Sequence, residues 1–282
     1  MTFDYSPGRS ERPPALDDIS AFVDDGEFLG VIGHTGSGKS TLMQHINGLL
    51  LPTSGRVVVN GLDLKDKASR RAARRSVGMA FQYPEQQLFA DSVIDDVAFG
   101  PRAIGMSDAE ARKRAEAALE RVDIDVCTYG HRSPFDLSGG EMRRVALAGI
   151  IAMQPSILAL DEPMAGLDPS GRDELLGILS RLHGEGMTIV MVSHDMEIIA
   201  AHAESVLVLR NGRVFAHGTP SEVFSRASEL REIGLGVPRV ARFAARLTEC
   251  GLALPDGLLS LDALADAIAT AVGAPCRGAG VR

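Results

Sequence analysis

The chain has 282 residues, 45% of them hydrophobic, with 29 basic and 37 acidic residues and a formal charge of −8. This length leaves room for a globular protein with a large core. The acidic balance argues against a nucleic-acid-binding protein, which needs a basic face. Because Cys127, Cys250 and Cys276 show no CxxC spacing, we expect reduced thiols in a cytoplasmic protein and no cysteine metal site.

The N-terminal region does not resemble a signal peptide. Residues 1–14 carry four charged side chains and no apolar core. The longest strongly apolar run, 145–153, is far shorter than the roughly 20 residues that cross a bilayer. We therefore expect the chain not to span a membrane by itself, although it could dock onto a protein that does.

The first predicted elements are short strands. Residues 27–33 (EFLGVIG) form an apolar run ending in glycine, as expected for a buried strand entering a loop. Two further strands are predicted over 55–61, which closes on the turn pair Asn60-Gly61, and over 76–82. Between them, 65–75 is predicted to be a helix, and its stretch SRRAARRS is expected to be a solvated helix face.

Residues 83–153 have a helical texture and predict a helical insertion. Ser107 and Glu110 form a capping box that opens a helix. Further along, LSGGE (137–141) precedes a helix predicted over 141–153, so a serine and two glycines present backbone N–H groups in the manner of a phosphate site. One face of the first helix is small or apolar: Ala111, Ala115, Ala118, Leu119 and Val122.

Strands and helices alternate again after residue 155. This alternation predicts a largely parallel sheet with helices on both faces. The segment 234–282 carries no chemical motif, and its end, GAPCRGAGVR, is expected to be a frayed tail. The predicted elements are strands at 156–163 and 187–195, helices at 170–183, 196–203 and 221–230, and a hairpin at 205–218 that turns at Asn211-Gly212.

The stretch GHTGSGKST fits the phosphate-loop pattern G-x-x-x-x-G-K-[ST] between a predicted strand and a predicted helix. Lys39 is expected to reach the terminal phosphates, and Ser40 to bind Mg²⁺. The alternative, a glycine-rich turn that matches by chance, is disfavoured by this context. The residues expected to contact the nucleotide here are Gly33, His34, Thr35, Gly36, Ser37, Gly38, Lys39, Ser40 and Thr41.

Acidic residues follow the apolar strand 157–160, at the carboxyl end where open α/β sheets bind ligands. Asp161 is expected to hold the Mg²⁺ shell, and Glu162 to orient and polarise the attacking water. The alternative is an acidic pair that caps the following turn. His194 ends the next strand and could bond the γ-phosphate or cap a helix. Three further residues are expected to lie in the core: Met79, Phe81 and Met191.

The order of the phosphate loop, Gln82, LSGGE, LDEP, GLD and His194 resembles the ATP-binding cassette (ABC) ATPase family over about residues 5–218. The resemblance implies an α/β P-loop NTPase (RecA-like) core with a mostly parallel sheet, an antiparallel β subdomain and a helical insertion at about 83–153. A C-terminal helical extension, 219–282, follows this ATPase domain, 1–218. Two such units associate head-to-tail in the family, so Ser138, Gly139 and Gly140 are expected to contact a γ-phosphate held by another chain.

The resemblance also implies roles for single residues, with ATP and Mg²⁺ as cofactors. Gln82 would sense Mg²⁺ and couple to a membrane subunit, and His194 would hold the γ-phosphate. Asp168 would lie at the dimer contact, and Tyr5 would stack on adenine. Glu141 replaces the commoner Gln of the signature, and Met164 stands where Ser or Thr is usual.

A closer resemblance is to the ATPases of energy-coupling factor (ECF) transporters, which import vitamins and trace metal ions. It rests on GHTGSGKSTLMQHINGLLLPTSG, FQYPEQQLFADSVIDDVAFGP and LSGGEMRRVALAGIIAMQPSILALDEPMAGLDPSGR. Thr35 and MQHINGLL resemble the second of two ATPase types, which pairs with a related first type, so a heterodimer is favoured over a homodimer.

The ECF resemblance implies a peripheral protein at the cytoplasmic face of the cell membrane. Its partners would be a transmembrane T component and a substrate-binding S component, with no nucleic acid. Tyr83, Leu88 and Phe89 would help to form the groove for the T component, unless they only pack the insertion. The alternatives are another ABC importer, a soluble ABC ATPase in iron–sulfur assembly or in nucleic-acid or ribosome work, and a regulator without turnover.

Overall fold

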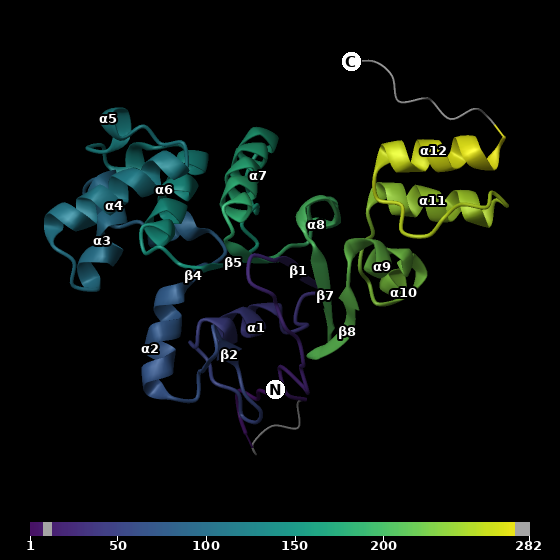
Figure 1. The fold of residues 1–282 in the computed structure, drawn as a ribbon, viewed down its shortest axis with the longest axis horizontal. Helices are drawn as coiled ribbons and strands as arrows, with labels where there is room; N and C mark the ends of the chain where they lie inside the picture. The colour runs from purple at the N-terminus through teal and green to yellow at the C-terminus, as the bar shows by residue number, and fades with distance from the viewer. Residues whose placement is uncertain (8–12, 274–282) are drawn as a thin grey trace.

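The computed structural model describes residues 1–7 and 13–273, and its centre is a sheet of strand order β4-β5-β6-β1-β7-β8 (Figure 1). Neighbouring strands from β4 to β7 are parallel, and β8 is antiparallel to β7. The predicted mostly parallel α/β sheet is confirmed. The strands are β1 (Phe28–Gly33), β4 (Val77–Ala80), β5 (Ile157–Asp161), β6 (Thr188–Val192), β7 (Ser205–Arg210) and β8 (Arg213–Gly218).

Alternate side chains of each central strand enter different cores, because the pleat turns them to opposite faces. Leu29 and Val31 of β1 pack in the core that includes α1 (Lys39–Ile46). Phe28 and Ile32 pack in the core that includes α7 (Pro169–Gly184) and α8 (Met196–His202). Figure 1 shows α1 below the sheet and α7 and α8 above it, so both faces are covered.

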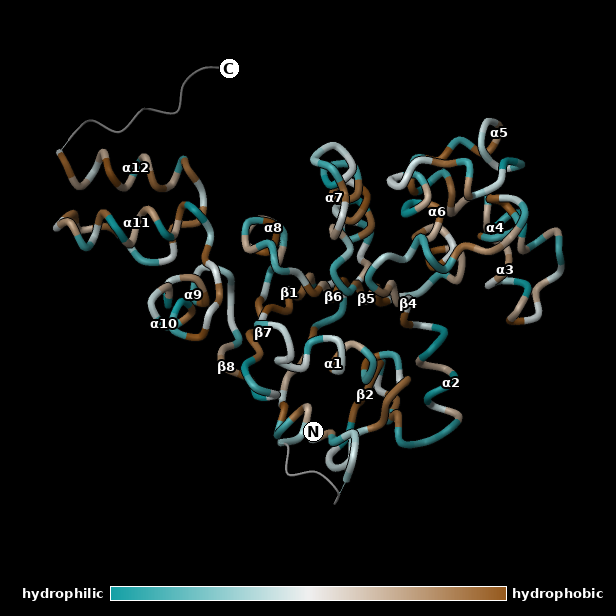
Figure 2. Tube along the Cα trace, turned by 180° about the vertical axis from the view of Figure 1, so that it is seen from behind, coloured by the Kyte–Doolittle hydropathy of each residue, from teal (hydrophilic) through white to brown (hydrophobic). Residues whose placement is uncertain are grey.

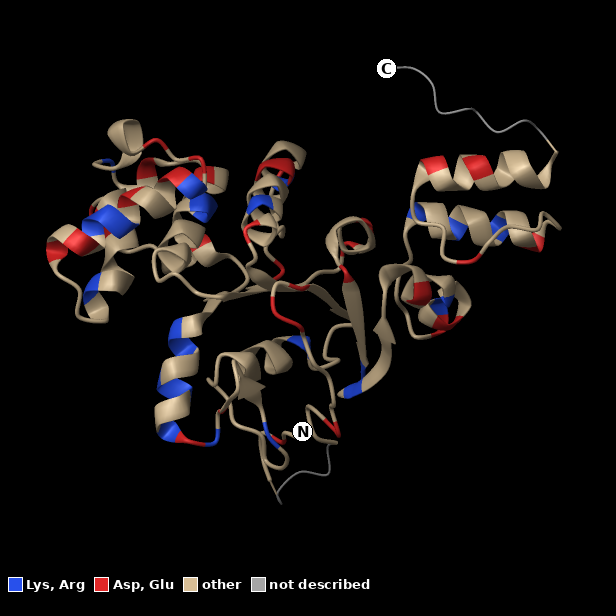
Figure 3. Cartoon of the chain, in the orientation of Figure 1, with Lys and Arg blue, Asp and Glu red and all other residues tan. Residues whose placement is uncertain are grey.

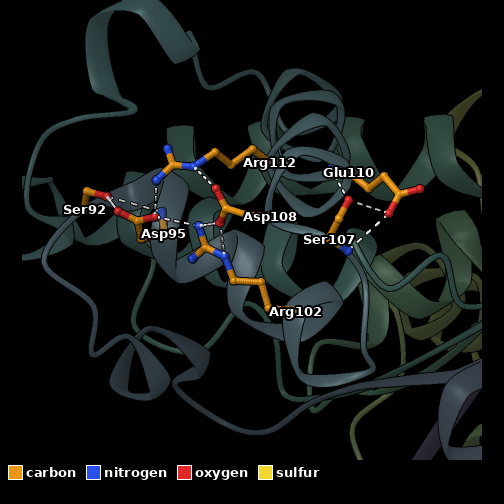
Figure 4. A network of polar contacts seen from close by, with 7 residues as sticks. All are labelled: Ser92, Asp95, Arg102, Ser107, Asp108, Glu110 and Arg112. Atoms are coloured by element: carbon orange, nitrogen blue, oxygen red, sulfur yellow. Dashed lines mark hydrogen bonds and ion pairs between the residues drawn. The ribbon is translucent and has the colours of Figure 1, made fainter.

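The predicted helical insertion lies between β4 and β5. The capping box is confirmed, since Glu110 Oε2 accepts from Ser107 N at 3.2 Å and the predicted small face of its helix is buried. Figure 4 shows Asp95 between Arg102 and Arg112, whose Nη2 atoms donate to it at 3.0 and 2.8 Å and tie two helices together. The helices are α3 (Val93–Ala103), α4 (Asp108–Arg121), α5 (Val126–Tyr129) and α6 (Gly139–Ile151).

The region before β4 differs in detail from the prediction. The strand predicted over 55–61 is only β2 (Val58–Val59), which forms a hairpin with β3 (Leu62–Asp63) across the predicted Asn60-Gly61 turn. Helix α2 (Lys67–Ser76) then leads directly into β4. Phe81, assigned to the core, is 37% exposed because β4 is the edge strand and ends at Ala80.

The C-terminal extension is helical, as predicted, but its first helix is interrupted. The helix predicted over 221–230 is instead α9 (Pro220–Ser225) and α10 (Ala227–Glu232), separated at Arg226, where ψ is 40°. Helices α11 (Arg239–Glu249) and α12 (Leu261–Ala271) follow and pack on each other. The frayed tail predicted for the last residues lies, from 274 onward, outside the described residues. Within the described residues, no helix is both long and apolar enough to span a bilayer.

Candidate nucleotide-binding site

The loop between β1 and α1 depends on glycine at two positions. Gly38 is the N-cap of α1 with a φ of 104°, and a Cβ there would lie 2.8 Å from Ala15 O. A Cβ on Gly33 would lie 2.5 Å from Leu209 O, so a side chain at either position would displace backbone. Among the described residues, no side chain caps the start of α1. Its first N–H groups are therefore available to an anion.

Lys39, the first residue of α1, is buried and folded back along this loop. Its Nζ donates to Gly33 O at 2.7 Å and to His34 O at 3.0 Å. Burial lowers the pKa of Lys39, while the carboxylates of Glu162 and Asp161 act to raise it. The ammonium group is thus within electrostatic reach of both predicted acidic residues, which lie more than a hundred positions away in the sequence.

Glu162 adopts a strained backbone conformation at the end of β5. Its φ of 52° is in the left-handed region, and its N–H donates to Val192 O on β6 at 3.0 Å. This bend brings Glu162 Oε1 to 3.3 Å from His194 Nε2, while His194 N donates to Oε2 at 3.4 Å. Burial raises the pKa of Glu162, although His194 acts to lower it. A partly buried carboxyl with a raised pKa beside lysine and histidine is typical of a catalytic site.

Tyr5 is exposed at the surface beside α1. Its hydroxyl lies 3.1 Å from Thr41 Oγ1, and its ring meets the ring of Phe3 edge-on at 4.8 Å. Phe3 also meets the ring of His45 on α1, at 4.7 Å. These contacts hold Tyr5 next to the helix that begins at the phosphate loop.

Ser138 is the N-cap of α6, and the helix begins at Gly139 rather than at the predicted Glu141. Glu141 Oε2 accepts from Ser138 N at 2.8 Å and from Ser138 Oγ at 2.7 Å, a second capping box. Within the part of the chain that the structure describes, a Cβ added to Gly139 or Gly140 would meet no atom within 4 Å. Packing within the chain therefore does not explain either glycine.

The signature segment and the phosphate loop belong to different parts of the molecule. Helix α6 packs on α3, α4, β4 and η1 (Pro84–Gln87), whereas α1 packs on β1 and β5. Figure 1 shows α6 in the helical group beyond the β4 edge and α1 beneath the sheet. Of the other predicted site residues, Gln82 is exposed after β4, and Asp168 caps α7 by accepting from Gly171 N at 2.8 Å.

Sequence reasoning missed Arg143, a buried residue of α6. Its Nε and Nη2 form a bidentate pair with Glu85 of η1 at 3.0 and 2.9 Å. Its Nη1 donates to Pro163 O at 2.9 Å and to Ala165 O at 2.7 Å, just after Glu162. One guanidinium thus joins the signature helix, the segment after Gln82 and the loop after β5. No local pattern predicts a pair of residues so far apart in the chain.

The turn between β7 and β8 supports the phosphate loop. Sequence reasoning did not predict this contact. Gly212 N donates to Ser37 O at 3.1 Å, and Asn211 Oδ1 lies 3.2 Å from His34 Nε2. The Asn-Gly pair predicted the turn, but nothing in the local sequence indicated what it would contact.

These features define a P-loop ATPase: the carboxyl edge of a parallel sheet carries a glycine-rich phosphate loop together with a lysine, two carboxylates and a histidine. The chain belongs to the ABC transporter family, whose model matches residues 16–165. It is 52% identical over 265 residues to the energy-coupling factor transporter ATP-binding protein EcfA2 of Symbiobacterium thermophilum, covering 94% of this chain and 92% of the relative. It is 46% identical over 266 residues to EcfA2 of Clostridium perfringens, covering 94% and 93%.

Solved structures show the same fold. The structure of cbiO1 from Clostridium perfringens, described as part of the ABC transporter complex cbiONQ, has a TM-score of 0.71 and 36% identity, covering 88% of this chain and 97% of that one. The dimeric ATP-binding cassette MJ0796, bound to ADP and Pi, has a TM-score of 0.68 and 29% identity, covering 77% and 95%. The ABC ATPase fold and the resemblance to ECF ATPases are therefore confirmed.

Proposed function

We propose that this chain is the ATP-hydrolysing subunit of an ECF-type importer and works at the cytoplasmic face of the cell membrane. The observation that carries its chemistry is the grouping of Lys39, Glu162 and His194 at one edge of the sheet. The names of its relatives favour an ECF importer over other ABC importers and over soluble ABC ATPases in iron–sulfur assembly, nucleic-acid or ribosome work.

In this proposal the triphosphate of ATP lies against the start of α1. The free N–H groups of residues 33–41 donate to phosphate oxygens. Lys39 Nζ turns from the carbonyls of Gly33 and His34 toward the terminal phosphates, which keeps its charge compensated. Tyr5 stacks on adenine, and the Thr41 hydroxyl, 3.1 Å from the Tyr5 hydroxyl, lies between the two parts of the nucleotide.

The residues at this edge fit Mg²⁺. Ser40, Asp161 and Gln82 offer a hydroxyl, a carboxylate and an amide oxygen, the donor types that Mg²⁺ accepts. One nearby oxygen, Ser37 Oγ, is buried without a hydrogen-bond partner among the described residues, which suits a site built around a further polar group. When bound, the ion neutralises phosphate charge as the terminal phosphoryl group is transferred to water.

Glu162 acts as the general base of the reaction. Its carboxylate orients the attacking water and accepts its proton, an effect worth about 10² to 10⁴-fold. Burial raises the pKa of Glu162 and so makes the carboxylate a better proton acceptor. His194, 3.3 Å from that carboxylate, donates a hydrogen bond to the γ-phosphate.

A second ATPase chain completes the pocket. The open space around Gly139 and Gly140 leaves room for the triphosphate bound to that chain, with Ser138 Oγ as a further donor. Asp168 lies at the contact between the chains. The resemblance to the second ECF ATPase type favours a heterodimer with a related first type.

The surface for the transmembrane T component lies after β4. Phe89 and Phe99 are 59% and 52% exposed and meet edge-on at 4.9 Å, with exposed Tyr83 in the segment that precedes η1. Leu88, which the sequence had grouped with them, is buried in the core. A separate S component would bind the vitamin or metal ion that is carried.

We extend the proposal to the domain boundaries. Residues 1–218 form the ATPase unit with its helical subdomain at about 83–153, and residues 219–282 form the extension. Helices α11 and α12 support this division because they share a small core of their own, built on Val240, Ala244 and Leu264.

The test is Glu162→Gln in the chain purified with its partners from detergent-solubilised membranes. The variant should keep ATP binding, lose at least about 10²-fold in turnover at the site that Glu162 serves and accumulate an ATP-bound dimer. The matched control is Glu174→Gln on the exposed face of α7, which should behave as wild type. Unchanged turnover in Glu162→Gln, or a wild-type chain that co-purifies with no integral-membrane protein, would refute the proposal.

A further inference from the structure

Helix α2 carries a row of basic side chains for which the ATPase site provides no use. Between residues 60 and 80 there are six basic residues and two acidic ones, in a chain whose formal charge is −8. Figure 3 shows blue bands along α2 with red only at its start. Lys67, Arg71 and Arg75 are four residues apart, so they lie on one face of the helix, and all three are exposed. We call these three residues the cationic stripe.

The other two arginines of α2 hold the helix in place. Arg70 Nη1 donates to Leu64 O and Lys65 O, both at 3.2 Å, and Arg74 Nη2 donates to Gly48 O at 2.8 Å. Within the described residues, no ion pair or hydrogen bond joins the cationic stripe to a carboxylate. Like charges four residues apart destabilise a helix slightly. No ion pair or hydrogen bond to a carboxylate within the described residues therefore accounts for the stripe.

The composition of this face suits a charged layer better than a protein pocket. The exposed residues between members of the stripe are Ala68, Ala72 and Arg74, none of them aromatic or large and apolar. Protein interfaces depend on such anchors packed into a partner. Anionic headgroups need only several cations within a Debye length of the surface.

The position of α2 is consistent with a membrane surface. Helix α2 leads into edge strand β4, and the exposed aromatic residues proposed to contact the T component follow the same strand. Figure 1 shows α2 and α3 at this edge of the sheet, on the opposite side from α11 and α12. We propose that the cationic stripe binds the anionic phospholipid headgroups of the bilayer and orients this acidic protein on the membrane. The placement of α2 at the membrane rests on the proposed function, whereas the attraction of the exposed cations to anionic headgroups does not.

The test uses the full chain with vesicles that contain no membrane protein, so it is independent of the proposed importer. Wild-type chain should sediment with vesicles of equal parts phosphatidylglycerol and phosphatidylcholine but not with phosphatidylcholine alone, and added salt should release it. Each exposed lysine or arginine near an anionic bilayer raises the membrane partition coefficient about fivefold, so Arg71→Glu/Arg75→Glu should reduce vesicle binding at least about 25-fold. Far-UV circular dichroism and ATP turnover should be unchanged.

The matched control is Arg242→Glu/Arg246→Glu, which makes the same change in net charge at exposed positions of α11. It should bind vesicles within a factor of about two to three of wild type, because α11 lies on the other side of the sheet. The proposal is overturned if wild type ignores phosphatidylglycerol, if the stripe variant binds like wild type, or if both variants lose binding equally. It is also overturned if free glycerol phosphate at matched concentration displaces the chain at constant ionic strength, since this would indicate a pocket for a soluble anion.

Discussion

Replacing Arg143 by methionine should destabilise the fold strongly and slow turnover. The substitution removes the partner of Glu85, whose side chain is only 18% exposed, and leaves the carbonyls of Pro163 and Ala165 without their donors. Breaking a buried ion pair on one side costs about 3–5 kcal/mol, and the partial exposure of Glu85 points to the lower end, about 3 kcal/mol. The loop that follows Glu162 also loses its attachment, so kcat should fall.

The neighbouring residue provides the control. Arg144 pairs with Glu174, whose side chain is 50% exposed, so Arg144→Met should cost at most about 1 kcal/mol. Urea unfolding at pH 7 measures both variants. Because the cost of Arg143→Met includes an unpaired carboxylate, adding Glu85→Met should recover part of it. If Arg143→Met falls within about 1 kcal/mol of Arg144→Met, the linking role assigned to Arg143 is wrong.

Three further predictions follow from the site. Tyr5→Ala should raise the KM for ATP about tenfold with kcat unchanged, because the stacking of the base on the ring is lost. Tyr5→Phe loses only the contact with Thr41 and should raise the KM about threefold. Equal KM values for Tyr5→Ala and wild type would remove Tyr5 from the site. Burial raises the pKa of Glu162 above its ordinary value of 4.5. At a pH above 4.5 the group is ionised in the unfolded chain but is harder to ionise in the folded one, so it lowers the free energy of unfolding there. Glu162→Gln should therefore raise the Tm at pH 7, and the gain should shrink as the pH falls toward 4.5; a gain that grows on acidification contradicts the assignment. Glu141→Gln removes the negative charge that accepts the hydrogen bond of the Ser138 hydroxyl, so the ATP concentration for half-maximal turnover should fall about threefold. A rise in that concentration would mean that the carboxylate assists the site.

Sequence reasoning predicted the parts of the site that depend on local backbone chemistry. Gly33 and Gly38 follow from the phosphate-loop pattern between a strand and a helix, and Glu162 follows from the end of a buried strand. These features need only a short stretch of sequence and the rule that parallel strands end at one edge.

Features set by long-range packing could not be predicted in this way. The pair of Arg143 and Glu85 joins two segments whose approach depends on the packing of the whole helical insertion. Phe81 was wrongly assigned to the core for the same reason, since hydrophobicity alone does not say which side of an edge strand is covered. Leu88 is buried in the core, which fits the alternative that it packs the insertion rather than the expectation that it lines a groove. The break at Arg226 is likewise a tertiary effect, because the surrounding residues have ordinary helix propensity.

The central claim is that two chains share each hydrolysis site, and Gly139→Arg tests it most directly. A side chain here has open space within its own chain, so the fold and ATP binding should be retained. The arginine would occupy the space assigned to the nucleotide of the other chain. In the protein purified with its partner ATPase, we predict ATP binding within a factor of about two of wild type and a loss of turnover of about 10²-fold or more at the site that holds the other chain's nucleotide. Full turnover in this variant would contradict a shared site.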